Sequence, residues 1–314
     1  ANLYNGVKMP MVGLGVMLTY GDECENMVRE ALDVGYRLFD TAKAYENEAA
    51  VGKAIAESGI AREDVFITSK IWITDAGYEK AKAAIEDSFK KLRTDYIDLF
   101  LIHMPAGDYF GTYRAFQEYY KEGRLRAIGV CNASPERLVD LALFNEIPPM
   151  VEQVETNVFF QQHELHSWME KYHVQHEAWG PLAQERIGEL VKHPLLNEIG
   201  AKYGKSASQI ALKHSVQRGI VIIPKSSHRE RMIQNIDLFD FTLSDEDMAA
   251  INALDEKHSI RSDYGNPIGM EMIATELKSK GVLHDKFAID YHKELNKYKS
   301  APRRRMQRRG ALII

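Results

Sequence analysis

Four ionisable side chains stand just after three consecutive apolar runs of the sequence. Asp40 and Tyr45 lie in FDTAKAY, Lys70 follows in TSK, and His103 follows in LIH. A phenol is a weak acid with a usual pKa of about 10, but a neighbouring ammonium favours the phenolate and eases proton donation. A carboxylate holds such an ammonium in place, and an imidazole orients a carbonyl oxygen. Each residue alone also fits a structural role, but together they predict that Tyr45 is a general acid with three partners.

These side chains must be placed by the elements that precede them. Apolar runs alternate with amphipathic stretches along most of the chain, which is typical of βα units with parallel strands. After a hairpin over residues 3–12 that turns at Asn5-Gly6, helices are expected over residues 23–34, 47–58 and 79–92. Strands are expected over residues 36–40, 65–68, 97–102, 125–130, 150–155, 174–178, 220–223 and 238–241.

Eight buried strands separated by helices predict the α/β class and a closed (β/α)8 TIM barrel, whose active sites lie at the carboxyl ends of the strands. A doubly wound dinucleotide-binding fold is disfavoured because the glycines near Gly13 and Gly15 lack the third glycine of its fingerprint. The βα pattern ends near Asp255. We therefore expect one barrel domain over residues 1–255 and a C-terminal extension over 256–314, partly disordered, with a helical stretch at 286–298.

The composition is that of a globular protein, with 45% hydrophobic and 27% charged residues in a chain of 314. The formal net charge is -5, although residues 301–314 hold five arginines and no acid. Residues 1–300 therefore hold 35 Lys+Arg against 45 Asp+Glu, a formal net charge of -10. This excess of acid argues against nucleic-acid binding through a broad basic face. The sequence does not indicate an oligomeric state.

Two cysteines, Cys24 and Cys131, are too few for a disulfide framework or a thiolate metal site, so we expect a reducing, cytoplasmic setting. No apolar run is long enough to span a membrane, and we expect no association with a membrane. Five histidines lie between His163 and His193. The spacing of His163 and His166 does not match a zinc motif, so we expect no metal and interpret these histidines as a solvated helix face.

Seven ordered segments give the chain a resemblance to a known family. They are GYRLFDTAKAYENEAAVGKAI, VFITSKIW, IDLFLIHMP, IGVCNAS, VEQVE, EAWGPLA and IPKSSHRERMIQN. They resemble the aldo-keto reductases, in particular the bacterial branch that includes 2,5-diketogluconate reductases, from about Gly6 to Asp255. The resemblance implies a (β/α)8 barrel that reduces aldehydes and ketones with NADPH, without metal or flavin. It also implies a catalytic tetrad in which Tyr45 donates the proton, completed by Asp40, Lys70 and His103.

The same resemblance implies a binding site for NADPH or NADP+. Asn132 and Gln153 would bind the nicotinamide carboxamide, and Trp179 would stack on the ring, roles that an amide and a flat indole can fill. The adenosine 2′-phosphate would lie at a basic helix start, which attracts phosphate. The residues implied there are Lys225, Ser226, His228 and Arg231, with Asn235 near the adenine.

The expected substrate pocket contains Met17, Trp72 and Met104 beside Trp179 and the loop at residues 106–110. Two methionines stand where the family usually has flat rings, which makes the pocket more adaptable. His228 stands where many bacterial members have Arg, and this predicts a pH-sensitive preference for NADPH over NADH. The sequence does not identify the carbonyl substrate. Two alternatives stay open: a Schiff-base aldolase using Lys70 or Lys225, and a cofactor-binding regulatory or structural barrel with little turnover.

Overall fold

The computed structural model describes residues 1–259, 267–279, 281 and 283. The chain forms two compact units, Ala1–Asn266 and Pro267–Ile314. In the second unit the structure describes one helix, α12 (Pro267–Ser279). The helix predicted at residues 286–298 and the arginine-rich end lie outside the described residues. No helix in the described ranges is long and apolar enough to cross a membrane.

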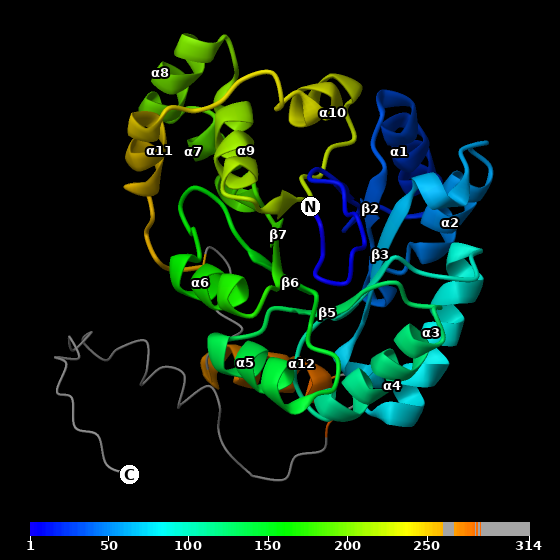
Figure 1. Cartoon of the computed structure of the whole chain (residues 1–314). Coiled ribbons are helices and arrows are strands. Elements are labelled where there is room, and N and C mark those ends of the chain that lie inside the picture. The colour runs from blue at the N-terminus through cyan, green and yellow to red at the C-terminus, as the bar shows by residue number, and fades with distance from the viewer. Residues whose placement is uncertain (260–266, 280, 282, 284–314) are drawn as a thin grey trace, which may run out of the picture. The chain divides into compact units, whose positions relative to one another are not determined.

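The first unit is built on an eight-stranded sheet in which sequence order and spatial order coincide (Figure 1). All seven neighbouring pairs are parallel. The strands are β1 (Leu14–Gly15), β2 (Leu38–Asp40), β3 (Phe66–Ile71), β4 (Leu99–Ile102), β5 (Ile128–Cys131), β6 (Val151–Glu155), β7 (Gln175–Trp179) and β8 (Val221–Ile222).

The two ends of this sheet are joined by hydrogen bonds. Val12 pairs with Ile222 in a parallel bridge. The N–H of Gly13 donates to the Ile222 carbonyl over 2.8 Å, and the N–H of Ile222 donates to the Met11 carbonyl over 3.0 Å. These bonds remove the free sheet edges. The predicted (β/α)8 barrel is therefore confirmed.

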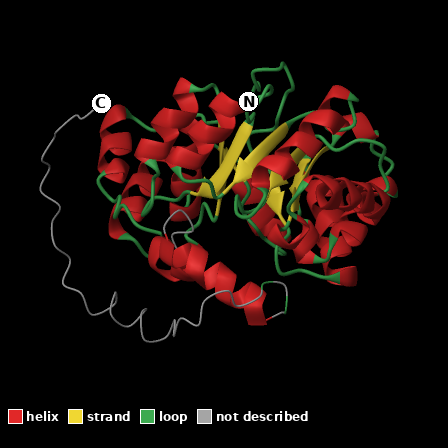
Figure 2. Ribbon diagram, turned by 90° about the horizontal axis from the view of Figure 1, so that it is seen from below, coloured by secondary structure: helices red, strands yellow, loops and turns green. Residues whose placement is uncertain are grey.

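Helices lie on the outside of the strands (Figure 2). In α1, the residues at helical spacing from Cys24 to Leu32 are buried, and Gly35 ends the helix with a φ of 115°, which favours glycine. The helices of this unit are α1 (Gly21–Val34), α2 (Glu48–Ala56), α3 (Tyr78–Leu92), α4 (Tyr109–Lys121), α5 (Pro135–Phe144), α6 (His163–Lys171), α7 (Ile187–Leu190), α8 (Pro194–Tyr203), α9 (Ala207–Gln217), α10 (Arg229–Ile236) and α11 (Asp245–Asn252).

One predicted strand is wrong, although the predicted number of strands is right. Residues 238–241 form a bend in which Leu238 is buried, while Asp237 and Asp240 both accept hydrogen bonds from Lys205. The missing strand is β1, whose two residues are too few to show an alternating pattern. The N-terminal hairpin is reduced to a turn at Gly6 and one isolated antiparallel bridge.

Close packing of α2 on the end of α3 gives a first testable prediction. A Cβ atom added to Gly52 would lie 2.5 Å from the Leu92 Cα atom, which is backbone and cannot rotate away. Gly52→Ala should therefore lower the free energy of unfolding by about 1–3 kcal/mol, measured by urea unfolding. Gly188→Ala is the control, since a Cβ there meets nothing within 4 Å. Equal stability of the two variants would contradict this packing.

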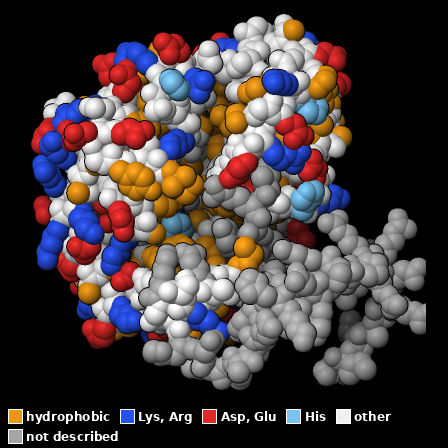
Figure 3. Space-filling model, turned by 180° about the vertical axis from the view of Figure 1, so that it is seen from behind, with side chains coloured by type: hydrophobic (Ala, Val, Ile, Leu, Met, Phe, Trp, Pro, Cys, Tyr) orange, Lys and Arg blue, Asp and Glu red, His pale blue; other side chains and the backbone are white. Residues whose placement is uncertain are grey.

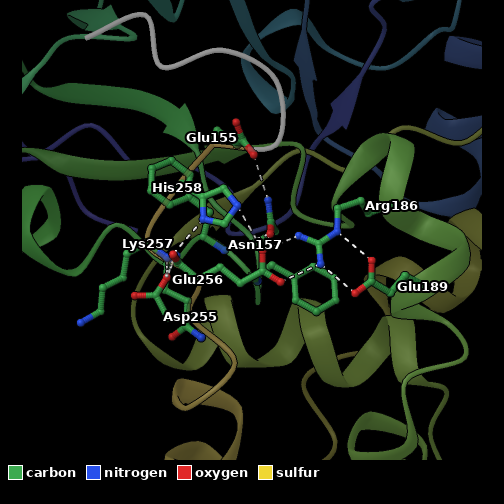
Figure 4. A network of polar contacts seen from close by, with 11 residues as sticks. Glu155, Asn157, Arg186, Glu189, Asp255, Glu256, Lys257 and His258 are labelled. Carbon is green, nitrogen blue, oxygen red and sulfur yellow. Dashed lines mark hydrogen bonds and ion pairs between the residues drawn. The ribbon is translucent and has the colours of Figure 1, made fainter. Parts of the chain in front are cut away.

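The segment after α11 is held to the barrel by polar contacts (Figure 4). The Arg186 guanidinium donates to both Glu189 and Glu256 and lies 4.2 Å from the Phe159 ring centroid. The N–H of Glu256 donates to the Phe159 carbonyl, and the Ser259 hydroxyl donates to Glu155 over 2.5 Å. Residues 256–259 thus pack on the loops after β6 and β7. The division of domains at residue 255 stays a prediction.

Candidate active site

The four predicted ionisable residues meet at the carboxyl ends of β2, β3 and β4. Asp40 ends β2, Lys70 lies near the end of β3, and His103 directly follows β4. Tyr45 ends a short 3-10 helix, Lys43–Tyr45, in the loop after β2. The Lys70 Nζ atom lies 5.0 Å from the centroid of the Tyr45 ring. The Tyr45 and His103 rings have centroids 5.5 Å apart in an edge-on arrangement.

Lys70 and Asp40 form a buried ion pair. The Nζ atom of Lys70 donates to Asp40 Oδ1 over 2.6 Å and to the Thr41 carbonyl over 3.0 Å. The two residues are 0% and 2% exposed. Burial opposes the charge on Lys70, but Asp40 and then Tyr45 favour it, and the pKa of Lys70 is raised. Lys70 therefore carries a full positive charge at neutral pH.

Tyr45 keeps its proton more firmly than the sequence suggests. Burial raises the pKa of Tyr45 to about 12, and this effect outweighs the opposing charge of Lys70, which also hydrogen-bonds the phenol. Lys70 favours the phenolate, as the sequence predicts, but burial has the larger effect on the pKa of Tyr45 in the free protein. Tyr45 is a neutral phenol at physiological pH. It holds the proton that a general acid needs.

His103 is an uncharged imidazole. Burial, followed by the positive charge of Lys70, lowers the pKa of His103 well below its usual value. The Trp72 ring packs edge-on against His103 with centroids 4.9 Å apart. The Nδ1 atom of His103 has no hydrogen-bond partner among the described residues. A neutral imidazole beside Tyr45 can orient a substrate oxygen without competing as an acid.

Of the predicted carboxamide-binding residues, Asn132 directly follows β5 and Gln153 lies within β6. The Asn132 Nδ2 atom donates to the His103 carbonyl over 3.1 Å, and its Oδ1 atom accepts from the Trp179 indole N–H over 2.9 Å. Asn132 thus links the end of β4 to the end of β7. Gln153 is 1% exposed and donates from Nε2 into the barrel, to Asp40 and to Glu177. Its carbonyl oxygen contacts the Cys131 thiol at 3.6 Å.

Of the predicted pocket residues, Trp72 and Met104 lie beside these groups. Met104 is buried, and its sulfur is 3.3 Å from Asn132 Nδ2. Met17 is half-buried in the loop after β1, where its carbonyl oxygen accepts from the Lys225 ammonium over 2.7 Å. The predicted loop at residues 106–110 is shorter than expected, because Tyr109 begins α4 and Asp108 caps that helix.

A cavity of about 350 Å³ borders this region without including the four ionisable residues. Asn132, Trp179, Glu155, Phe160 and Ser259 are among the residues that line it. On one face of the molecule, hydrophobic side chains gather around a central hollow with charged side chains around it (Figure 3).

The basic segment after β8 surrounds the start of α10. Ser226 is buried, and its hydroxyl accepts from the His228 N–H over 3.1 Å, while Arg231 is exposed. His228 gives α10 no side-chain cap, so the N–H groups of the first turn are open to an anion. The ammonium of Lys225 contacts the carbonyls of Met17 and Leu18 and is exposed. An uncapped helix start with exposed cations fits a phosphate group.

Asn235 and His166 both have polar partners within the protein. Asn235 is 4% exposed and hydrogen-bonds the buried Tyr36 phenol, so its side chain already has a partner within the protein. His166 was expected on a solvated face, but its Nδ1 atom lies 3.0 Å from Nδ1 of the buried His176. That interpretation is wrong for His166, because α6 packs this side chain on β7, and for His176, which is buried on β7 itself. In the described part of the chain, no cluster of His, Cys, Asp or Glu could hold a metal ion.

Sequence reasoning missed Glu177, which is fully buried in β7 and touches Gln153. The available signal was an acidic residue inside a strand that is buried on both sides, within the segment EAWGPLA. A buried carboxyl group needs a partner. A buried acidic residue at position 177 therefore predicts a polar partner inside the barrel.

A family model described as the aldo/keto reductase family matches residues 12–256. Glyoxal reductase from Bacillus subtilis (strain 168) is 46% identical over 260 residues, which cover 82% of this chain and 93% of that protein. The crystal structure of an aldo-keto reductase enzyme from a Medee basin deep-sea metagenome library is 44% identical, with a TM-score of 0.83, and the match covers 85% of this chain and 98% of that one.

A second structure bears on the cofactor. The aldo-keto reductase of Bombyx mori, solved in complex with NADP, is 33% identical, with a TM-score of 0.79 over 85% of this chain and 96% of that one. The open start of α10 and the exposed Arg231 fit the same cofactor here. The chain belongs to the aldo/keto reductase family and is an NADP-dependent oxidoreductase that acts on carbonyl compounds.

Proposed function

We propose that this protein reduces aldehydes or ketones to alcohols, with Tyr45 as the proton donor. The observation that carries the proposal is the position of the Tyr45 ring, 5.0 Å from the Nζ atom of Lys70 in the buried Lys70–Asp40 pair, with the His103 ring beside it. When bound, NADPH supplies the hydride. Tyr45 donates its hydroxyl proton to the substrate oxygen, and the Lys70 ammonium stabilises the phenolate that remains. Asp40 holds Lys70 in place, and His103 orients the oxygen.

We further propose which residues hold the cofactor and the substrate. Asn132, Gln153 and Trp179 bind the nicotinamide end. Lys225, Ser226, His228 and Arg231 bind the 2′-phosphate, which gives a preference for NADPH over NADH, and Asn235 supports the adenine end. Met17, Trp72 and Met104 line the substrate pocket. Support comes from the position of these groups at the carboxyl ends of the strands and around the start of α10.

The substrate is proposed to be a small-molecule carbonyl compound. The name of glyoxal reductase makes glyoxal a rational first test compound. We propose a cytoplasmic location, supported by two cysteines that are both free and buried. We propose no nucleic-acid partner, on the excess of acidic residues outside the arginine-rich end.

The rival functions lack support. A Schiff-base lysine must lose its proton to attack a carbonyl, whereas the pKa of Lys70 is raised by Asp40 and Tyr45. Lys225 donates to two backbone carbonyls. The family and its reductase relatives support turnover rather than a purely structural role.

The test is an assay of the purified full chain with NADPH and a panel of glyoxal, other aldehydes and ketones. We expect carbonyl-dependent loss of NADPH absorbance, and a lower rate with NADH because NADH lacks the 2′-phosphate. Tight NADPH binding without turnover on any carbonyl would favour the regulatory barrel instead. Trapping of a substrate on Lys70 or Lys225 by borohydride would favour the aldolase.

A further inference from the structure

Gln153 connects opposite walls of the barrel. It lies on β6, and its Nε2 atom donates over 2.8 Å to Asp40 Oδ2 on β2, 113 residues away in the sequence. In the closed order of eight strands, β2 and β6 face each other across the barrel. The other oxygen of Asp40 accepts from Lys70. One carboxylate thus joins the lysine beside Tyr45 to the amide of Gln153.

The same amide nitrogen has a second acceptor. Gln153 Nε2 also donates over 2.9 Å to Oε2 of Glu177, which pairs with Gln153 in the β6–β7 register. Glu177 is 0% exposed, and its Oε1 atom has no hydrogen-bond partner within the described residues. Burial, and then the charge of Asp40, raises the pKa of Glu177 to about 8, with Gln153 and Lys70 acting in the opposite direction.

These two contacts fix which way the Gln153 amide faces. An amide NH2 group has two N–H bonds, and here Asp40 and Glu177 each accept one. Reversing the amide would break both of these bonds and place its carbonyl oxygen against the ionised Asp40 carboxylate, which is unfavourable. The carbonyl oxygen of Gln153 therefore remains available to accept a hydrogen bond from a ligand, since its contact to the Cys131 thiol, at 3.6 Å, is long. With Asp40 alone as acceptor, the orientation would be held by a single bond.

We propose that Glu177 is a positioning residue for cofactor selection. Glu177 accepts the second N–H of Gln153, so the carbonyl oxygen of Gln153, which is an acceptor and not a donor, faces the nicotinamide carboxamide. An acceptor selects a ring substituent that carries an N–H. This role rests on the proposed function, in which Gln153 binds the carboxamide. It gives β7 a part in the cofactor site that is separate from the stacking of Trp179.

The test compares two cofactors that differ at this substituent. NADP+ carries a carboxamide, and its acetylpyridine analogue carries a ketone that has no N–H. Calorimetry on the full chain should give a dissociation constant about tenfold higher for the analogue, the factor expected from one hydrogen bond. In Glu177→Met, the Gln153 amide keeps only its bond to Asp40 and reverses more readily to donate to the ketone, so the ratio of the two constants should fall below that of the unaltered protein. Glu177→Ala repeats the test if the Met variant does not fold.

Three comparisons separate positioning from general damage. Glu177→Gln keeps an acceptor and should keep the discrimination; its loss there would overturn the role of the acceptor. Glu48→Met is the matched control, since Glu48 is also buried, with one oxygen bonded to Ser69 and one without a partner among the described residues. An equal fall in the Glu48 variant, or an unchanged ratio in Glu177→Met, would overturn the proposal. Failure of the unaltered protein to bind NADP+ would instead overturn the proposed function.

Discussion

Tyr45→Phe should reduce kcat for carbonyl reduction by about 10²- to 10⁴-fold, the usual contribution of a positioned general acid. The substitution removes the hydroxyl that holds the transferable proton and leaves the ring, which packs edge-on against His103. Because burial raises the pKa of Tyr45 to about 12, the phenol is almost fully protonated at neutral and mildly alkaline pH. Titration of Tyr45 should therefore cause no loss of activity between about pH 6 and pH 9.

The measurement is steady-state NADPH oxidation with an aldehyde, together with the dissociation constant for NADP+. We expect the dissociation constant to change little, since Tyr45 is proposed to act on the substrate oxygen. Tyr119→Phe is the matched control, because its phenol donates to Glu86 on the outside of the barrel. If Tyr45→Phe retained the full kcat, Tyr45 would not be the proton donor.

Lys70→Met should damage both stability and turnover. It leaves Asp40 at 2% exposure without a cation, and removing one partner of a buried pair costs about 3–5 kcal/mol. It also removes the positive charge that stabilises the Tyr45 phenolate, so kcat should fall by at least about 10²-fold. Urea unfolding and the NADPH assay, run below the unfolding range, measure the two effects separately.

The control for this second variant is Lys43→Met, on the neighbouring loop. Lys43 and Asp75 are 2.9 Å apart, as close as an ordinary ion pair, but both side chains are 25% exposed. A pair of that kind contributes about 0–1 kcal/mol. Similar losses of stability in the two lysine variants would show that burial does not increase the cost of breaking the Lys70–Asp40 pair.

The sequence predicts the barrel, and the meeting of four ionisable residues at its rim, because both depend on local signals; the catalytic roles of these residues stay predictions. Apolar runs such as residues 97–102 and 220–223 identify buried strands, and parallel strands must present their carboxyl ends at one rim. That rule alone brings Asp40, Lys70 and His103 together. The division of residues into barrel and extension, and the individual cofactor contacts, stay predictions.

What the sequence does not predict depends on contacts between distant residues. β1 has two residues and is a strand because it lies between β2 and β8. The pKa of Tyr45 depends on burial that only the packed barrel creates. The partners of Gln153 lie on β2 and β7, so its orientation cannot be read from the segment VEQVE. Each of these features needs the closed barrel.

The bonds between residues 11–13 and Ile222 also set an order for biosynthesis. The first strand of the barrel has its second neighbour in β8, and the nearby contact between Lys225 and Met17 spans 208 residues. In a nascent chain, β1 therefore cannot pair on both sides until β8 has left the ribosome, when nearly the whole barrel has been synthesised. Such long-range closure slows folding and leaves strand edges open to aggregation until it is complete. Chains that terminate before β8 should consequently be substrates for chaperones and proteases rather than shorter enzymes.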